Sequence, residues 1–196
     1  MNKIILDNKE FIDLVIEKDS ICNIGVDYNI SKINIILKDN VSLVINHYSE
    51  VEKNVFYLNV KQENNSNFTY NHSFINNNNK YDLNINIDLI GNDSKNIINI
   101  NGISDNGVSN VLVNGSVIKD TTNNELYENI KMLNINEGKS SIVPNMFINT
   151  KNVIANHAAS ITNINKDYLF YLNCKGIKDK ECIKLIKNGF LNNEAR

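Results

Sequence analysis

The residues of this chain that could bind a metal ion or act as nucleophiles include three histidines and three cysteines. Cys22, Cys174 and Cys182 lack the paired spacing of a zinc site, and their odd number does not suggest a disulfide framework. This usage is typical of a reducing compartment. Cys174 and Cys182 lie on either side of a glycine, and we expect both to be small buried hydrophobic residues, with a ligand role as the alternative.

Carboxylates could support a different chemistry, that of a polysaccharide lyase. Such an enzyme, when it is built on a β-helix, needs acidic side chains close together on adjacent turns of the helix, where they often bind Ca²⁺. The candidate acids Asp82, Asp88 and Asp93 are scattered along the sequence. The chain also lacks a Gly-x-x-x-x-Gly-Lys-Ser/Thr loop, so nucleotide chemistry would have to come from a partner.

Two short helices are predicted near the end of the chain. Asn165 occupies an N-cap position before apolar residues spaced three and four apart, and Gly176 is placed to end that helix. A second, amphipathic helix is predicted from about Asp179. Its apolar side carries Cys182, Ile183, Ile186 and Phe190, and its polar side carries Lys180, Lys184 and Lys187. The two helices are expected to form a hairpin that covers one end of the preceding domain.

The chain before these helices shows the alternation of apolar and polar residues that is typical of β-strands. The clearest runs are Ile33–Leu37, Val41–Ile45, Phe56–Val60, Leu83–Ile87, Ile97–Ile100 and Val111–Val113. This spacing fits a β-sandwich and a β-solenoid equally well. Asparagine-rich turns favour the solenoid, because stacked turns can ladder identical amides along the axis. The predicted division is a strand domain over residues 1–162 and a helical segment over 163–196.

The segment from Glu63 to Lys80 is crowded with polar residues. We predict a strand pair here, joined by a loose asparagine-rich loop, with disorder at Asn76–Asn79 as the alternative.

Length and charge restrict the class of protein. A chain of 196 residues is long enough for one domain with a hydrophobic core. A net charge of −2, without a basic stripe, argues against a nucleic-acid partner. No apolar run is long enough for a signal peptide or a membrane-spanning helix, so the expected location is the cytoplasm.

The amino-acid sequence of the C-terminal region resembles the signature of the SufB/SufD family, the scaffold proteins of the SUF iron–sulfur cluster assembly system. The resemblance covers about the last fifty residues and keeps both the order and the spacing of the motifs. The matching residues are Pro144, Asn149-Thr150, the stretch Asn156–Ser160, Leu169–Leu172 with Lys175–Ile177, and Gly189-Phe190.

The resemblance implies a fold and a role. The fold is a right-handed parallel β-helix followed by a small helical segment. The role is that of a non-catalytic scaffold that holds no tightly bound cofactor, with a transient iron–sulfur cluster formed at a subunit interface. Typical members are longer and carry an N-terminal helical region, so the resemblance is to a short form.

Two departures from the family pattern point to the SufD-like type. Asn129 stands where SufB-type sequences carry cysteine, the residue that iron–sulfur clusters favour as a ligand. Ala158 stands where they carry glutamate. His157 matches a family histidine near the interface and is the implied metal ligand, whereas an inert histidine at a strand end is the plainer alternative. His47 and His72 match nothing in the family pattern.

The resemblance also implies partners. The helical hairpin would dock a SufC-type ATPase, and the second scaffold subunit would be SufB-type or an identical copy. The residues expected to contact the ATPase are Leu169, Phe170, Tyr171, Leu172, Lys175, Gly176 and Ile177. Two alternatives from other classes are a carbohydrate-active β-helix enzyme and a purely structural dimerisation module.

Overall fold

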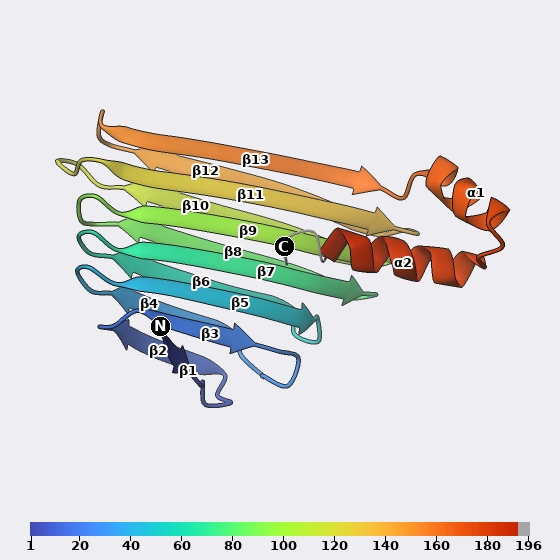
Figure 1. Ribbon diagram of the computed structural model, residues 1–196, viewed down its shortest axis with the longest axis horizontal. Coiled ribbons are helices and arrows are strands. Elements are labelled where there is room, and N and C mark those ends of the chain that lie inside the picture. The colour runs from blue at the N-terminus through green and yellow to red at the C-terminus, as the bar shows by residue number, and fades with distance from the viewer. Residues whose placement is uncertain (192–196) are drawn as a thin grey trace.

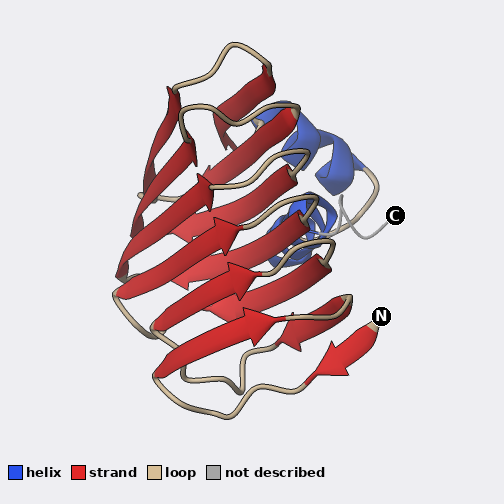
Figure 2. Cartoon of the chain, turned by 90° about the vertical axis from the view of Figure 1, so that its left-hand side faces the viewer, coloured by secondary structure: helices blue, strands red, loops and turns tan. Residues whose placement is uncertain are grey.

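The chain folds into a parallel β-solenoid with two helices at its C-terminal end (Figure 1). The computed structural model describes residues 1–191. Odd-numbered strands form one sheet, in the order β1-β3-β5-β7-β9-β11-β13, and even-numbered strands form the other, in the order β12-β10-β8-β6-β4-β2. The chain therefore crosses from one sheet to the other at each turn and completes about five turns. Figure 2 shows the two stacks of strands face to face, with both helices on one side.

The elements follow one another without long connections. The strands are β1 (Asn2–Ile4), β2 (Phe11–Ile16), β3 (Ser20–Ile24), β4 (Lys32–Leu37), β5 (Ser42–Glu50), β6 (Val55–Gln62), β7 (Asn67–Asn77), β8 (Lys80–Leu89), β9 (Lys95–Asp105), β10 (Val108–Val117), β11 (Asn124–Ile135), β12 (Lys139–Ile148) and β13 (Val153–Asn163); the helices are α1 (Lys166–Cys174) and α2 (Asp179–Leu191).

The alternating sequence pattern explains the core. In β8 every second side chain, from Tyr81 to Leu89, is buried between the two sheets, and the residues between them face outward. A period of two places successive side chains on opposite faces of a strand, so each strand contributes one apolar row to the interior. The predicted parallel solenoid is therefore confirmed, and the β-sandwich alternative is not.

Asparagine stabilises the stack in two ways. It occupies most of the turn positions with a positive φ, such as Asn40, Asn65 and Asn123, a conformation that asparagine tolerates better than most residues. Asparagine side chains also ladder along the outer faces of the sheets. In the even-numbered sheet each amide donates to the residue one turn earlier, at 2.7–2.9 Å, along Asn145, Asn114, Asn86, Asn59, Asn34 and Asp13.

The prediction for the segment from Glu63 to Lys80 is wrong in its loop. Strand β7 runs to Asn77, and a tight turn at Asn78 and Asn79 leads directly into β8. Asn76 is buried, and its amide donates to the carbonyl oxygens of Asn79 and Val108. These bonds satisfy the asparagine inside the solenoid, so this stretch is neither a loose loop nor disordered.

Both predicted helices are present. The side chain of Asn165 accepts a hydrogen bond from the backbone N–H of Asp167 at 2.8 Å, which confirms it as the N-cap of α1. Gly176 has φ 83°, the left-handed conformation that favours glycine after a helix, so its predicted role is also confirmed. Cys182 is buried under α1, where its thiol donates to Asn173 Oδ1.

The position of the hairpin differs from the prediction. Helix α2 packs on the outer face of the odd-numbered sheet, on the side of the solenoid and not across its end (Figure 1). Its apolar residues Ile183, Ile186 and Phe190 lie against Ile103, Leu133 and Ile135, which point away from the main core. Outward-facing apolar residues on β9 and β11 provide this second contact surface. The alternation of apolar and polar residues in the sequence does not predict such a surface. The helices do not cover the last strand of either sheet, β12 or β13.

Within residues 1–191, no helix is long and apolar enough to cross a membrane.

Candidate functional site

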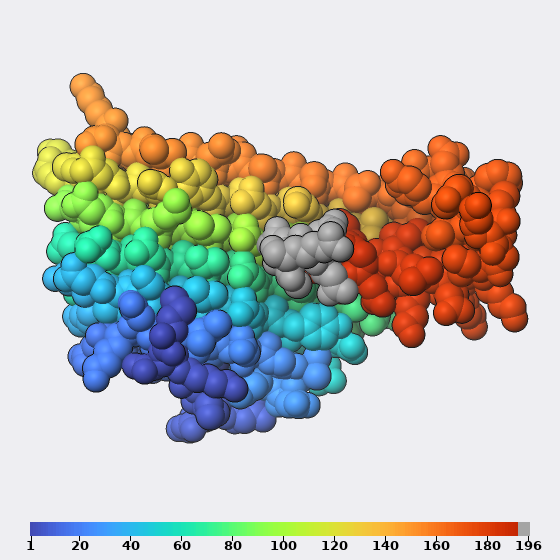
Figure 3. Space-filling model, in the orientation of Figure 1, coloured from blue at the N-terminus to red at the C-terminus, as the bar shows by residue number. Residues whose placement is uncertain are grey.

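The last turn of the solenoid leaves one end of the core uncovered. Strands β12 and β13 are the last strands of their sheets, and β13 is exposed along almost its whole length, at the upper edge in Figures 1 and 3. Each strand also carries a row of side chains that faces inward, in register with buried residues one turn earlier. We call this surface the open end. Its residues are Ser140, Ile142, Pro144, Met146 and Ile148 of β12 and Val153, Ala155, His157, Ala159 and Ile161 of β13.

His157 lies in the middle of the β13 row of the open end. Its register partner on β11 is Glu128, and since register partners on parallel strands point to the same face, both side chains are directed toward the interior layer. His157 is exposed, whereas Glu128 has no exposed surface. Asn129 and Ala158, the next residues along, face outward and pair with each other.

Glu128 is a residue that the sequence reasoning missed. Among the described residues, no hydrogen-bond partner reaches either of its carboxylate oxygens. Burial raises the pKa of Glu128 to about 7, because the apolar surroundings disfavour the charged form. The signal that could have revealed it is a single acidic residue at an inward position of β11, between Leu126 and Ile130.

A glycine on the opposite sheet makes room for this carboxyl group. A Cβ atom added to Gly115 of β10 would lie 2.9 Å from Glu128 Oε1 and would also collide with Leu126. The side chain of Glu128 therefore reaches across the interior to the backbone of β10. The register partner of Gly115 in the next turn is Met146 of the open end.

The residues predicted to contact an ATPase lie on α1 and the turn after it, and they fall into two groups. Phe170 and Tyr171 are 71% and 60% exposed, and the neighbouring Tyr168 is 66% exposed. Leu169, Leu172 and Ile177 are half-buried against the rest of the hairpin. Helix α1 buries no residue completely, so it presents an aromatic face that nothing in residues 1–191 covers.

Lys175 and Gly176, the other two predicted contact residues, are exposed at the end of α1. The ammonium group of Lys175 lies 5.5 Å from the centre of the Tyr171 ring, within range of a cation–π interaction. Cys174 is also exposed there, so its predicted burial is wrong. Cys174 is the last residue of α1, a helix that buries none of its residues completely.

The two histidines that matched no motif meet inside the solenoid. His47 and His72 are register partners on β5 and β7, and the hydroxyl group of Tyr70 lies between them, 2.8 Å from His47 Nδ1 and 2.6 Å from His72 Nδ1. Burial lowers the pKa of His47 to about 3, and burial together with the nearby His47 lowers the pKa of His72. Both rings are therefore neutral at pH 7. The one proton of the Tyr70 hydroxyl can serve one ring only, so the other ring donates to its oxygen.

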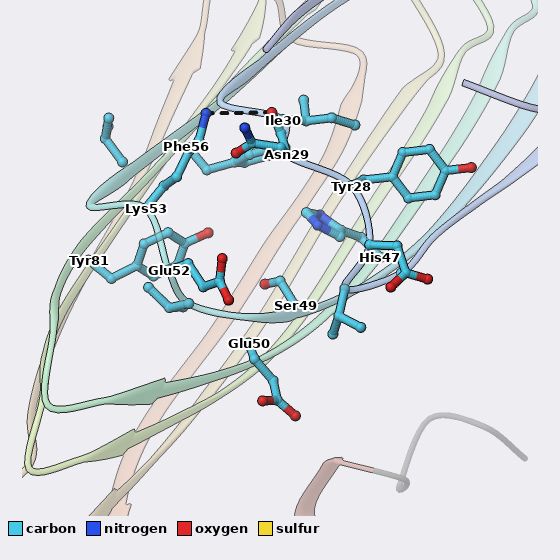
Figure 4. Close-up of a pocket in the computed structure, with 15 residues that line it drawn as sticks. Tyr28, Asn29, Ile30, His47, Ser49, Glu50, Glu52, Lys53, Phe56 and Tyr81 are labelled. Carbon is cyan, nitrogen blue, oxygen red and sulfur yellow. Dashed lines mark hydrogen bonds between the residues drawn. The ribbon is translucent and has the colours of Figure 1, made fainter. Parts of the chain in front are cut away.

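A pocket of about 160 Å³ adjoins His47 (Figure 4). It lies between the turn at residues 25–30 and the turn at residues 49–53, and the side chains of Ser49, Glu52 and Tyr81 also line it. The pocket lies several turns away from His157 along the solenoid. Thiol groups are not among its lining residues.

The structure does not bring together the carboxylates considered for a lyase. Asp82 and Asp88 lie on one strand, six positions or roughly 20 Å apart. Asp93 occupies a turn and bonds to Asn123. In the part of the chain that the structure describes, no three His, Cys, Asp or Glu side chains form a preassembled metal site.

Comparison with protein families gives one match over most of the chain. The model for "SUF system FeS cluster assembly, SufBD core domain" matches residues 26–190, a range that includes both the open end and α1. A search of curated proteins finds no match to the chain.

Proposed function

The chain belongs to the SufBD core domain family of the SUF system for FeS cluster assembly, and on this premise we propose that it is a non-catalytic, SufD-like scaffold subunit. In this role it associates with a second scaffold subunit, SufB-type or identical, and with a SufC-type ATPase. The single observation that carries the proposal is the pair of uncovered surfaces, the open end and the aromatic face of α1, both within the matched residues.

The open end is suited to a second scaffold subunit. Strand β13 contains no Asp, Glu, Lys or Arg, and its free edge can accept hydrogen bonds from another strand. The inward-facing row adds apolar surface, including Ile161, which is 47% exposed. Such a surface, rimmed by polar groups, is typical of a protein–protein interface.

His157 gives this interface a ligand for iron. A neutral imidazole binds iron, and the exposed position of His157 on the open end would place it between the two subunits. None of the three cysteines lies on the open end: Cys22 is on β3, Cys174 on α1 and Cys182 on α2. In this proposal the thiolates for a complete cluster come from a SufB-type partner, since an identical copy would likewise lack cysteine at its open end, and the cluster is the cargo of the complex.

The aromatic face of α1 is suited to the ATPase. Phe170 and Tyr171 are large, exposed and adjacent, and aromatic residues are enriched among those that dominate binding energy at interfaces. The chain then receives mechanical work from nucleotide hydrolysis in its partner and transmits it along the solenoid.

Co-purification with a SufC-type ATPase tests the docking proposal. The double variant Phe170→Ala, Tyr171→Ala is expected to lose at least tenfold in affinity, because both anchors are removed while the half-buried Leu169 and Leu172 still hold the helix. Phe11→Ala is the matched control, since Phe11 is an equally exposed aromatic (64%) on β2. Unchanged co-purification of the double variant would refute docking through α1.

A further inference from the structure

Glu128 is costly for the fold as it stands. Its carboxyl group is fully buried, and within residues 1–191 it has no hydrogen-bond donor to compensate for lost hydration. Burial of an unpaired carboxyl group destabilises a folded protein strongly, so such groups are rare unless a ligand or partner compensates them.

The position of Glu128 indicates what could compensate it. It lies one layer below the open end, directly beside His157 in register, with the strands about 4.8 Å apart. Gly115 leaves a space on the opposite strand that the carboxyl group enters. An imidazole and a carboxylate on one face of adjacent strands can share a single ion.

We propose that Glu128 and His157 together bind one ferrous ion at the open end of this chain. The inference rests on the proposed function in one respect, since it takes iron to be the cargo of the complex. It adds a second protein ligand and specifies the form of iron, a single Fe²⁺ bound before any cluster is complete.

The ligand types favour a single divalent ion over a cluster. Imidazole nitrogen and carboxylate oxygen suit Fe²⁺ and similar first-row ions, whereas iron–sulfur clusters favour thiolates, which the open end lacks. Because only two side chains contribute, water completes the coordination in the isolated chain. The remaining positions are then open to ligands of a docked subunit.

Binding requires Glu128 to change its side-chain rotamer. Its Oε1 now lies beside Gly115, and no hydrogen bond joins it to His157. The rotation moves the carboxyl group from an apolar interior to a cation, and the attraction to the cation offsets the free energy lost when the group was buried. The same argument predicts that removing the charge stabilises the chain when iron is absent.

The test is anaerobic titration of the isolated 196-residue chain with Fe²⁺ in competition with a chromophoric chelator. The wild type is expected to bind one ion, and Glu128→Gln and His157→Ala are each expected to weaken binding at least tenfold. The double variant should bind Fe²⁺ at most a few-fold more weakly than the single variant with the lower affinity, because both side chains are ligands of the same ion. Glu137→Gln, at an exposed turn position, is the matched control and should bind as the wild type does.

A second readout separates a ligand from a structural residue. Without metal at pH 8, Glu128→Gln is expected to raise Tm by a few degrees, because the amide is neutral and the carboxylate is not. Wild-type affinity in Glu128→Gln, absence of Fe²⁺ binding by the wild type, or a lowered Tm in Glu128→Gln would each overturn the inference. Co-purification with the ATPase does not depend on Glu128, so a failure of the iron site leaves the docking result unaffected, and the reverse also holds.

Discussion

The buried polar residues of this protein differ in whether they have hydrogen-bond partners, and this difference affects the stability of the fold. His47 and His72 are buried with their hydrogen bonds satisfied by Tyr70, whereas Glu128 is buried without a partner. A satisfied polar group contributes to a defined core, and an unsatisfied one costs free energy. The histidine cluster therefore has a sufficient structural explanation, and Glu128 does not.

The buried histidines predict a loss of stability in acid. Their pKa values in the folded state lie below the ordinary value of 6.5, and that of His47 is about 3. The unfolded chain therefore binds protons below pH 6.5 that the folded chain does not, and stability falls as the pH drops from 6.5 toward 3. At pH 5 the expected loss from His47 is about 2 kcal/mol, and His72 lowers the stability further in the same direction.

Urea unfolding at pH 7 and pH 5 measures this loss. The variant His47→Leu, His72→Leu should be less stable at pH 7, because the hydroxyl of Tyr70 loses its partners, but should change less between the two pH values. His157→Ala, which changes the exposed histidine of β13, is the matched control. An equal fall in stability for the wild type and the double variant would contradict the prediction.

Glu128 acts in the opposite direction over part of the same range. Its pKa is raised from 4.5 to about 7 in the folded state, so its contribution to stability is fully present below pH 4.5 and is lost as the pH rises through 7. The unfolding series is therefore best repeated in a Glu128→Gln background. There, the fall between pH 7 and pH 5 should be steeper than in the wild type.

At the scale of elements, the sequence predicts the strands and helices well and their placement poorly. The alternation in runs such as Leu83–Ile87 identifies the inward face, and Asn165 and Gly176 mark the limits of α1. Placement depends on pairing between distant residues. The laddered side chains are 21 residues apart at Asp13 and Asn34 but 31 residues apart at Asn114 and Asn145, so the turns lengthen along the chain and leave no fixed repeat to detect.

The candidate site was predictable only in part for the same reason. His157, Phe170 and Tyr171 are found from local motifs, since each lies within a short recognisable stretch. Glu128 has significance only because β11 and β13 pair in one particular register, and a shift by one residue would turn it outward. The cluster of His47, Tyr70 and His72 likewise depends on the pairing of β5 with β7.

The attachment of α2 to the sheet supports a prediction about the whole hairpin. Lys187 forms an ion pair with Asp105 at 2.7 Å, and both side chains are mostly buried, at 20% and 17% exposed. Lys187→Met leaves the Asp105 carboxylate without its cation and is expected to cost about 1–2 kcal/mol, less than a fully buried pair. Hydrogen exchange should show faster exchange of α2 amides. Lys184→Met, on the exposed side of the same helix, should not change it, and equal exchange in both variants would refute the anchoring role.

At the scale of the whole molecule, the free edges of the last strands of the two sheets, β12 and β13, are protected to different degrees. Natural proteins shield free strand edges with charged side chains, proline or a covering element. Strand β12 has Pro144 and Lys139, which weaken its free edge, but β13 has neither charge nor proline over Val153–Asn163. The hairpin packs beside the stack and leaves this edge free. An unprotected edge over an apolar layer is a surface that another strand can extend.

Introducing a charge into the open end is therefore expected to prevent subunit association and to leave the fold intact. Ile161→Lys replaces a half-exposed apolar side chain, and the lysine can reach water when the chain is alone but would be buried without a partner in a complex. Native mass spectrometry of the chain, alone and with a SufB-type subunit, should show the dimer in the wild type and monomer in the variant, with circular dichroism unchanged. Phe11→Lys, a similar change on β2 at the opposite end of the even-numbered sheet, is the control and should still associate. Association of Ile161→Lys at wild-type affinity would show that the second subunit binds elsewhere, and His157 would then no longer lie between two scaffold subunits.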